Sequence, residues 1–207
     1  CAYTEARSIE RGESTIAHDS RRIQRIFLEP QAPEAYEPAL QAIINADLIV
    51  LGPGSLYTSV LPNLLVDGIT EAIKWSRGTT AYVCNVATQH GETDHFGYED
   101  HIREVIAYLG KGELDCAIVN DNPAAFGAIN EINDVEAIVY DGADSVADGV
   151  KIYARDVVSD PNPLRHDPAK LATILLEIAR ESRAASIQSP RPVIEDPTRA
   201  TPVNVAA

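Results

Sequence analysis

Three short apolar segments lie in the middle of the chain, and amphipathic segments precede or separate them. The apolar segments cover residues 47–51, 80–86 and 115–120. Runs of this length, bounded by polar residues and glycine, are typical of strands buried on both faces of a sheet. The amphipathic segments, with apolar residues at helical spacing, cover residues 35–46, 62–76 and 99–109. Strands that alternate with helices predict right-handed crossovers and a mostly parallel sheet, so the expected fold class is α/β.

The first thirty residues carry a weaker pattern of short alternating stretches. A turn at Arg11–Gly12 divides them, and we expect two or three strands here, the last over residues 22–28. Glu13 and Ser14 follow the glycine, where exposed polar residues are typical of a hairpin turn. This part of the sequence therefore predicts strands joined by a hairpin.

Beyond residue 120 the pattern predicts two further strands and one helix. The strands cover residues 136–140 and 150–158, and an acidic turn separates them. Asp167 is the expected N-terminal cap of the helix, which carries a clear apolar stripe and runs to Arg183.

The residues after Arg183 differ in composition from the rest of the chain. They are polar and contain four prolines, so we expect a disordered tail over residues 184–207. The remaining length is ample for one domain with its own core. We therefore expect a single domain over residues 1–183.

The charge of the chain limits the partners that it can bind. The formal net charge is −14 at pH 7, whereas a nucleic-acid surface needs clustered lysine and arginine. We expect no nucleic-acid partner. A mononucleotide stays compatible with this charge, because backbone N–H groups can hold its phosphates.

The cysteines and the apolar runs indicate the compartment. Cys84 and Cys116 lie in apolar segments, where a free cysteine behaves as a small apolar side chain, and the third cysteine, Cys1, leaves no disulfide framework. We therefore expect a cytoplasmic protein. No apolar run is as long as a membrane span and the charged first thirty residues do not resemble a signal peptide, so no membrane partner is expected.

The loop after the first apolar segment has the chemistry of an anion site. Residues 47–59 read DLIVLGPGSLYTS, in which Gly52 and Gly54 let the backbone approach a ligand without a Cβ in the way. Ser55, Tyr57, Thr58 and Ser59 add hydroxyl groups beside free backbone N–H groups. The motif lacks the third glycine of GxGxxG and the lysine of a Walker loop, so an ordinary strand-to-helix connection is the alternative.

Polar loops follow all three central strands. They cover residues 52–59, 85–94 and 120–123. Because ligands bind at the carboxyl ends of parallel strands, we expect these loops to form one crevice. A phosphate-bearing ligand such as a nucleotide or nucleotide-sugar would lie on residues 52–59, with Asn85, Thr88 and residues 92–94 facing it.

Two other chemistries compete for these loops. A metal site would use His90, Glu92, Asp94, His95 and His101, but their spacing fits no standard zinc pattern. Mg²⁺ held jointly by a carboxylate and ligand phosphates is the more plausible metal hypothesis. A serine nucleophile at Ser55 would need the G-x-S-x-G elbow, and GPGSL matches only its first half.

The sequence also resembles a known family. The blocks LGPGSLYTSVLPNLLVDGITEAI, YVCNVATQHGETDHFGYEDHI and RHDPAKLA are similar to those of the YvcK-type gluconeogenesis factors, over about residues 12–180. These proteins belong with the 2-phospho-L-lactate transferases in one larger family of Rossmann-like, three-layer folds. The resemblance implies a cytoplasmic bacterial protein that binds UDP-N-acetylglucosamine and links gluconeogenic carbon metabolism to cell-wall synthesis and cell shape.

The resemblance also assigns residues to the ligand. It implies that the phosphates are lined by Gly52, Gly54, Ser55, Tyr57 and Thr58, with Asn85 and Thr88 beside them. The sugar or base would be bordered by Glu92, Thr93, Asp94 and Phe96. His95 stands where the family usually has glycine, which changes what we expect of the local backbone.

Two family features have no counterpart in the 207 residues. Relatives begin with a strand and a GGGTG loop, followed by a DDGGS motif, and neither motif occurs here. The chain begins at Cys1 and contains no methionine. We therefore expect an N-terminally truncated fold that lacks its first strand-helix units and the first of two phosphate loops.

Three functional hypotheses follow. The first is a nucleotide-sugar-binding regulatory protein with no established reaction, either alone or as a homo-oligomer. The second is a Mg²⁺-dependent transferase of a phosphate-bearing group, with Asp94 or Glu92 assisting the metal or acting as base. The third is a scaffold that binds the ligand only within a longer protein.

Overall fold

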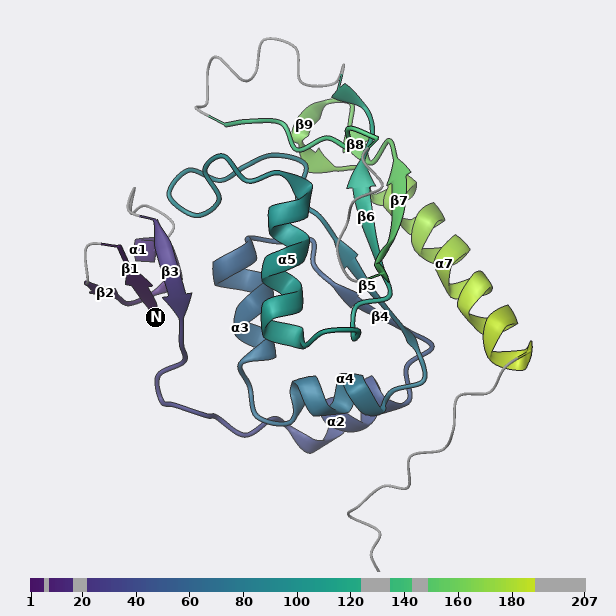
Figure 1. The fold of residues 1–207 in the computed structure, drawn as a ribbon, viewed down its shortest axis with the longest axis horizontal. Helices are drawn as coiled ribbons and strands as arrows, with labels where there is room; N and C mark the ends of the chain where they lie inside the picture. Colours follow the sequence, from purple (N-terminus) through teal and green to yellow (C-terminus); the bar gives the residue numbers. More distant parts are fainter. Residues whose placement is uncertain (6–7, 17–21, 124–134, 143–148, 189–207) are drawn as a thin grey trace, which may run out of the picture.

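Four parallel strands form the central sheet of the computed structural model, which describes residues 1–5, 8–16, 22–123, 135–142 and 149–188 (Figure 1). In spatial order they are β4 (Leu48–Leu51), β5 (Thr79–Val83), β6 (Cys116–Asn120) and β7 (Lys151–Arg155). Every neighbouring pair is parallel. The predicted α/β class and parallel sheet are confirmed.

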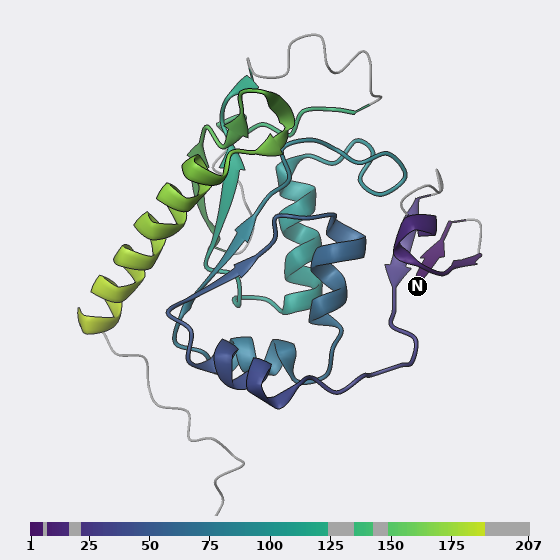
Figure 2. The same cartoon turned by 180° about the vertical axis from the view of Figure 1, so that it is seen from behind.

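Helices cover both faces of this sheet, as Figures 1 and 2 show from opposite sides. Ala81 and Val83 of β5 point to the cluster that contains α7 (Pro168–Gln188). Tyr82 and Cys84 point the other way, into the cluster beneath α5 (Tyr98–Leu109). This alternation along one strand produces three layers and a Rossmann-like arrangement.

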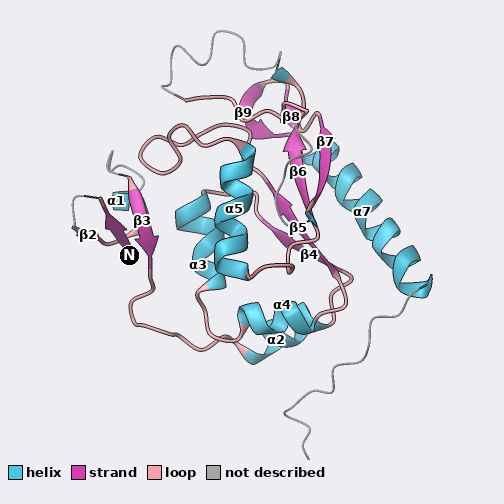
Figure 3. Cartoon of the chain, viewed as in Figure 1, coloured by secondary structure: helices cyan, strands magenta, loops and turns pink. Residues whose placement is uncertain are grey.

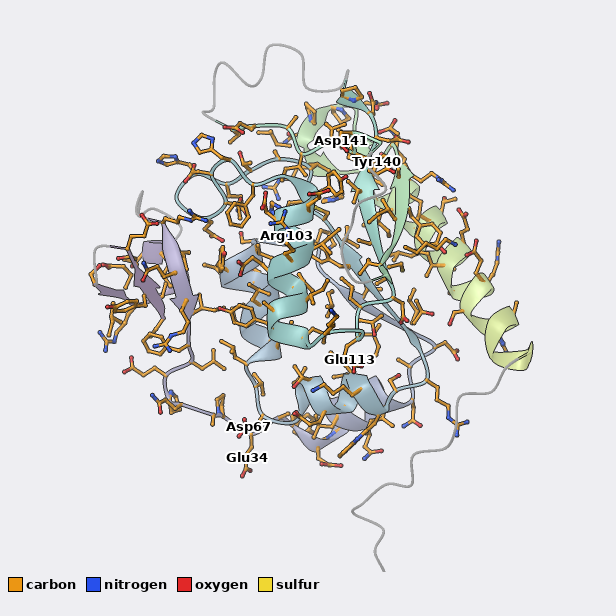
Figure 4. The ribbon with its side chains drawn as sticks, viewed as in Figure 1. Glu34, Asp67, Arg103, Glu113, Tyr140 and Asp141 are labelled. Atoms are coloured by element: carbon orange, nitrogen blue, oxygen red, sulfur yellow. The ribbon has the colours of Figure 1, made fainter. Side chains whose placement is uncertain are left out.

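The helix predicted over residues 62–76 is in fact two helices. A π-helical turn, η1 (Leu56–Val60), runs into α3 (Leu61–Leu64), and α4 (Ile69–Trp75) begins afresh after Gly68. Gly68 has a φ of 89°, which ends a right-handed helix. Asp67 also pairs with Glu34 in a parallel bridge, and Figure 4 labels both residues. At this bridge the chain leaves the direction of α3, and α4 then packs against α2 (Glu37–Ile44).

The N-terminal residues form a small antiparallel sheet. Its order is β2 (Ile9–Glu10), β1 (Ala2–Thr4), β3 (Ile23–Ile26). The predicted strand at 22–28 is confirmed in its central part. The predicted hairpin turn at Arg11–Gly12 is wrong, because Gly12 leads into the short helix α1 (Glu13–Ile16). The Ile16 N–H donates to the Gly12 carbonyl over 3.1 Å, which closes that helix.

The C-terminal part differs from the prediction in its strands. Residues 136–140 form no strand but make one antiparallel bridge, between Ala137 and Ala87. Residues 150–158 divide into β7 and β8 (Val158–Ser159), and β8 pairs with β9 (Asn162–His166). The strand β9 was missed because Asn162–Pro163 reads as a turn in the sequence.

The final helix begins as expected and ends later than expected. Asp167 Oδ1 accepts hydrogen bonds from the N–H groups of Ala169 and Lys170, at 2.8 and 2.9 Å, which confirms the cap. The helix α7 continues to Gln188, so the boundary predicted at Arg183 is too early. The rest of the predicted tail, residues 189–207, lies outside the described residues.

The strand β4 is less buried than its apolar sequence predicts. In the described part of the chain it pairs only with β5, and Val50 is 37% exposed. An edge strand is covered less completely than a central one. The prediction that β4 is buried on both faces is therefore wrong. By contrast β6 is buried along its whole length.

Among the described helices, none has the length and apolar character needed to cross a bilayer.

His101 on α5 provides a test of the core. Its side chain is fully buried, and its Nδ1–H donates to the Gly97 carbonyl at 2.9 Å. Burial lowers the pKa of His101 below the usual value of 6.5. The His101 side chain therefore binds a proton near pH 6.5 in the unfolded chain but only at lower pH in the folded chain. The contribution of neutral His101 to the free energy of unfolding is complete above pH 6.5 and decreases as the pH falls below it.

We expect the free energy of unfolding to decrease between pH 7.5 and pH 5.5, by at most about 1.4 kcal/mol per pH unit from His101. Urea denaturation at a series of pH values measures this slope. His101→Asn should flatten it, while the same change at exposed His90 serves as the control. Equal slopes in the wild type and His101→Asn would contradict the prediction. A smaller slope will remain, because burial also lowers the pKa of His166.

Candidate functional site

A polar crevice of about 770 Å³ lies at the carboxyl ends of the sheet strands. The loop after β4 contributes Pro53, Gly54, Ser55 and Ser59. The loop after β5 contributes Asn85, Ala87, Thr88 and Gln89. Val135 and four residues of β9, Asn162, Leu164, Arg165 and His166, complete the described lining. Figure 3 shows β8 and β9 at the same end of the sheet as these loops.

The two glycines of the first loop fix the shape of this wall. Gly52 has a φ of +83°, and a Cβ there would lie 3.1 Å from the Val83 carbonyl oxygen. A Cβ on Gly54 would lie 3.2 Å from the Cβ of Ser59. The loop thus turns sharply against β5 and brings Ser55 and Ser59 to the crevice, as the sequence predicts for two of its hydroxyl groups.

The aromatic residues assigned to the ligand lie in the core instead. Tyr57 is buried, with its ring centroid 6.4 Å from that of Phe96, and Phe96 packs in turn on His101. Burial raises the pKa of the Tyr57 hydroxyl. Neither aromatic residue is among those that line the crevice, because the turn η1 directs Tyr57 inward. Tyr57 belongs to the core cluster beneath α5, and Phe96 packs against that cluster.

The acidic residues of the second loop are not among the described residues that line the crevice. Glu92 is buried and accepts a hydrogen bond from Thr58 Oγ1 at 3.1 Å, which ties this loop to the first. Asp94 accepts from the Gly91 N–H at 2.8 Å and lies 3.3 Å from His90 Nδ1. Thr93 is fully buried, and its Oγ1 accepts from the Gln89 N–H. These contacts hold the shape of the loop.

This arrangement bears on the metal hypotheses. No group of three or more His, Cys, Asp or Glu side chains suited to a metal occurs in the described parts of the chain. None of the described lining residues carries a carboxylate. Glu92 and Asp94 therefore do not fit the role of Mg²⁺ ligands in this crevice, and Mg²⁺ that entered with a nucleotide would be held by the phosphates.

Asn85 and Thr88 lie where the sequence predicts, on the crevice wall. Thr88 also fixes the neighbouring segment: its Oγ1 accepts from the Glu136 N–H at 2.7 Å, and its own N–H donates to the Glu136 carbonyl at 2.8 Å. Beyond this segment, the Tyr98 hydroxyl donates to Asp141 at 3.0 Å, near the start of α5 (Figure 4).

His95 has a left-handed backbone conformation. Its φ is 63°, in the left-handed region that favours glycine, which is the residue that the resemblance leads us to expect there. Its ring Nδ1 lies 2.6 Å from Glu136 Oε1. The imidazole thus supplies a link between the second loop and the 135–142 segment that a glycine would not make.

The strand β9 contributes two functional candidates that the sequence patterns did not identify. Arg165 is exposed in the crevice and is the only described lining residue with a permanent positive charge. His166 donates its Nε2–H to the Cys84 carbonyl at 3.1 Å, which joins β9 to the end of β5. The signal was present, since Arg165 and His166 open the RHDPAKLA block.

The predicted third loop has a structural role instead. Asn120 is buried, and its Oδ1 accepts from the N–H groups of Asn122 and Val157 at 3.3 and 3.5 Å. This side chain fixes the turn after β6 and the approach to β8. Residues 120–123 are not among those that line the crevice.

The fold and the crevice define a Rossmann-like α/β protein with a ligand-sized polar site at the carboxyl edge of its sheet. Residues 1–158 match the model of a protein family described as 2-phospho-L-lactate transferase CofD. The chain therefore belongs to the CofD family.

Individual relatives show which members of this family the chain resembles. The chain is 40% identical over 184 residues to the gluconeogenesis factor of Halalkalibacterium halodurans, covering 87% of this chain and 57% of that protein. It is 37% identical over 173 residues to the gluconeogenesis factor of Bacillus subtilis, covering 82% and 55%. The resemblance to gluconeogenesis factors is thus confirmed. The chain spans a little over half the length of these relatives.

A solved structure agrees with the fold. A crystal structure of a member of the UPF0052 family from Bacillus halodurans matches with a TM-score of 0.78 and 39% sequence identity. The match covers 84% of this chain and 57% of that chain. The Rossmann-like class is therefore confirmed by an independent structure.

Proposed function

We propose that the chain binds a nucleotide-sugar, UDP-N-acetylglucosamine, in the crevice between the loops after β4 and β5. The observation that carries this proposal is the combination of the Gly54 backbone, hydroxyl and amide groups, and the guanidinium of Arg165 around one cavity. Its volume of about 770 Å³ lies in the usual range for small-molecule sites. Backbone approach at Gly54 and the charge of Arg165 suit phosphates.

The biological role that we propose follows the relatives that carry the name gluconeogenesis factor. In this proposal the protein is a cytoplasmic regulator whose ligand occupancy reports nucleotide-sugar supply and links gluconeogenic carbon metabolism to cell-wall synthesis and cell shape. The crevice offers binding groups without a carboxylate base in its described lining, which favours a binding role over a reaction.

Isothermal titration calorimetry of the 207-residue chain with UDP-N-acetylglucosamine tests the proposal. We expect saturable one-to-one binding, with uridine alone binding at least about tenfold more weakly because it lacks the phosphates. No heat at near-millimolar ligand would overturn the proposal for this chain. Binding by a longer protein that includes the N-terminal glycine loop, with none by this chain, would support the scaffold hypothesis instead.

The family match also supports a second candidate, a transferase of a phosphate-bearing group. A turnover assay with a deazaflavin acceptor and Mg²⁺ distinguishes it from binding alone. Activity that Asp94→Asn abolishes would favour the transferase. We expect no such activity, because Asp94 is held by the Gly91 N–H and His90 at the rim of its own loop.

A further inference from the structure

Gln89 connects the two loops that line the crevice. Its Nε2 group donates to Ser55 Oγ over 2.7 Å, and its Oε1 accepts from Asn85 Nδ2 over 3.3 Å. All three residues are half-buried and line the crevice. Two successive hydrogen bonds therefore run along the crevice wall, from the loop after β5 to the loop after β4.

The backbone of Gln89 is held rigidly. Its N–H donates to Thr93 Oγ1 at 2.9 Å, and its carbonyl accepts from the N–H groups of Glu92 and Thr93 at 3.0 and 2.9 Å. Both Glu92 and Thr93 are buried. The amide of Gln89 is thus presented to Ser55 from a fixed base, which is what a preorganised binding site requires.

The direction of these hydrogen bonds determines what Ser55 can do. The amide nitrogen of Gln89 can only donate, so Ser55 Oγ must accept from it. Within the described residues, no hydrogen bond uses the hydroxyl hydrogen of Ser55, and Ser55 lines the crevice. A partner of this hydrogen has to be a hydrogen-bond acceptor.

We propose that Gln89 is a positioning residue that holds Ser55 as a hydrogen-bond donor toward a diphosphate. The proposal rests on the proposed function and deepens it, because it names the part of the ligand that the first loop selects. The diphosphate of a nucleoside-diphosphate sugar offers only acceptor oxygens at neutral pH. A charged acceptor strengthens the bond that Ser55 donates, whereas the uncharged nucleoside gains nothing from it.

A double-mutant cycle tests this assignment. We measure the dissociation constants of UDP-N-acetylglucosamine and of inorganic pyrophosphate for the wild type, Gln89→Met, Ser55→Ala and the double variant. Each single change should weaken binding of both ligands by about tenfold or more, the usual effect of a lost hydrogen bond to a charged group. The double variant should be within about twofold of Ser55→Ala, because Gln89 acts through Ser55.

Two controls separate positioning from a general structural effect. Gln41→Met makes the same chemical change on α2, where the Gln41 amide donates to Glu37 at 3.0 Å, and should leave binding unchanged. The weak binding of uridine should be the same in Gln89→Met and the wild type. An equal loss of uridine and UDP-N-acetylglucosamine binding in Gln89→Met would indicate a distorted crevice and overturn the proposal.

The outcomes for the two proposals are distinct. Additive losses in the double variant, with intact wild-type binding, would overturn the role of Gln89 alone. Wild-type binding of pyrophosphate but not of UDP-N-acetylglucosamine would overturn the proposed ligand, while a non-additive cycle with pyrophosphate would still support the role of Gln89. Absence of wild-type binding to either ligand would overturn both.

Discussion

Replacing Arg165 by methionine should weaken binding of UDP-N-acetylglucosamine by about thirtyfold to a hundredfold, corresponding to roughly 2–3 kcal/mol. Arg165 is the one described lining residue with a permanent positive charge, in a protein whose formal net charge is −14. An anionic ligand that enters the crevice therefore depends on this guanidinium. Methionine keeps most of the length of the side chain and removes the charge and all of its donors.

The matched control is Arg103→Met. Arg103 lies on α5, as labelled in Figure 4, where it pairs with Asp100 at 3.1 Å and with Glu99 at 3.4 Å. The substitution changes the net charge by the same amount and should alter the dissociation constant less than about twofold, since exposed pairs contribute little. Calorimetry of both variants gives the comparison. An equal effect of the two changes would mean that only the total charge of the protein affects binding. Unchanged binding by Arg165→Met would show that Arg165 does not contact the ligand.

Replacing Gly78 by alanine should have the largest effect on stability, a loss of about 3 kcal/mol. A Cβ at this position would overlap the Ala46 carbonyl oxygen and would lie 2.9 Å from the Asp47 carbonyl carbon. These are backbone atoms, so no side chain can rotate to relieve the overlap. The cause is the close approach of the two backbones just before the parallel pair β4 and β5 begins, where the Thr79 N–H donates to the Asp47 carbonyl at 3.1 Å.

Gly112→Ala separates steric overlap from backbone strain. Gly112 has a φ of +83°, but a Cβ there would have nothing within 4 Å. Its replacement should cost only the strain of a left-handed alanine, about 1 kcal/mol. Urea unfolding of both variants, followed by circular dichroism, measures the two free energies. A loss at Gly78 no larger than that at Gly112 would show that the two backbones separate easily at this position.

Most of the central architecture could be predicted from local patterns. Apolar runs and helical spacing identify β4, β5, β6 and α5, because the sheet buries β5 and β6 and partly buries β4, and one face of the helix packs on the sheet. The helix break at Gly68 was not predictable in this way. It depends on the bridge between Glu34 and Asp67, which joins residues that are far apart in the sequence.

The site was predicted in outline and not in detail. The glycine loop, Asn85 and Thr88 were identified because loop chemistry is local and the carboxyl edge of a parallel sheet is a general binding position. The inward direction of Tyr57 depends on the π-helical turn, which no residue pattern predicted, and Phe96 packs near the Tyr57 ring. Arg165 was missed because β9 carries Pro163 and polar neighbours that look like a turn, so its place in the crevice follows only from pairing with β8.

The bond between His166 and the Cys84 carbonyl has a consequence for the order of folding. One wall of the crevice comes from residues 53–59 and 85–89, and the other from residues 162–166, so the walls are joined by contacts about eighty residues apart in the chain. Contacts of such high sequence separation slow folding, because the entropy cost of closing the loop comes before the contact stabilises anything. We therefore expect the wall that carries Arg165 to be completed after the more local pairing of β4 with β5.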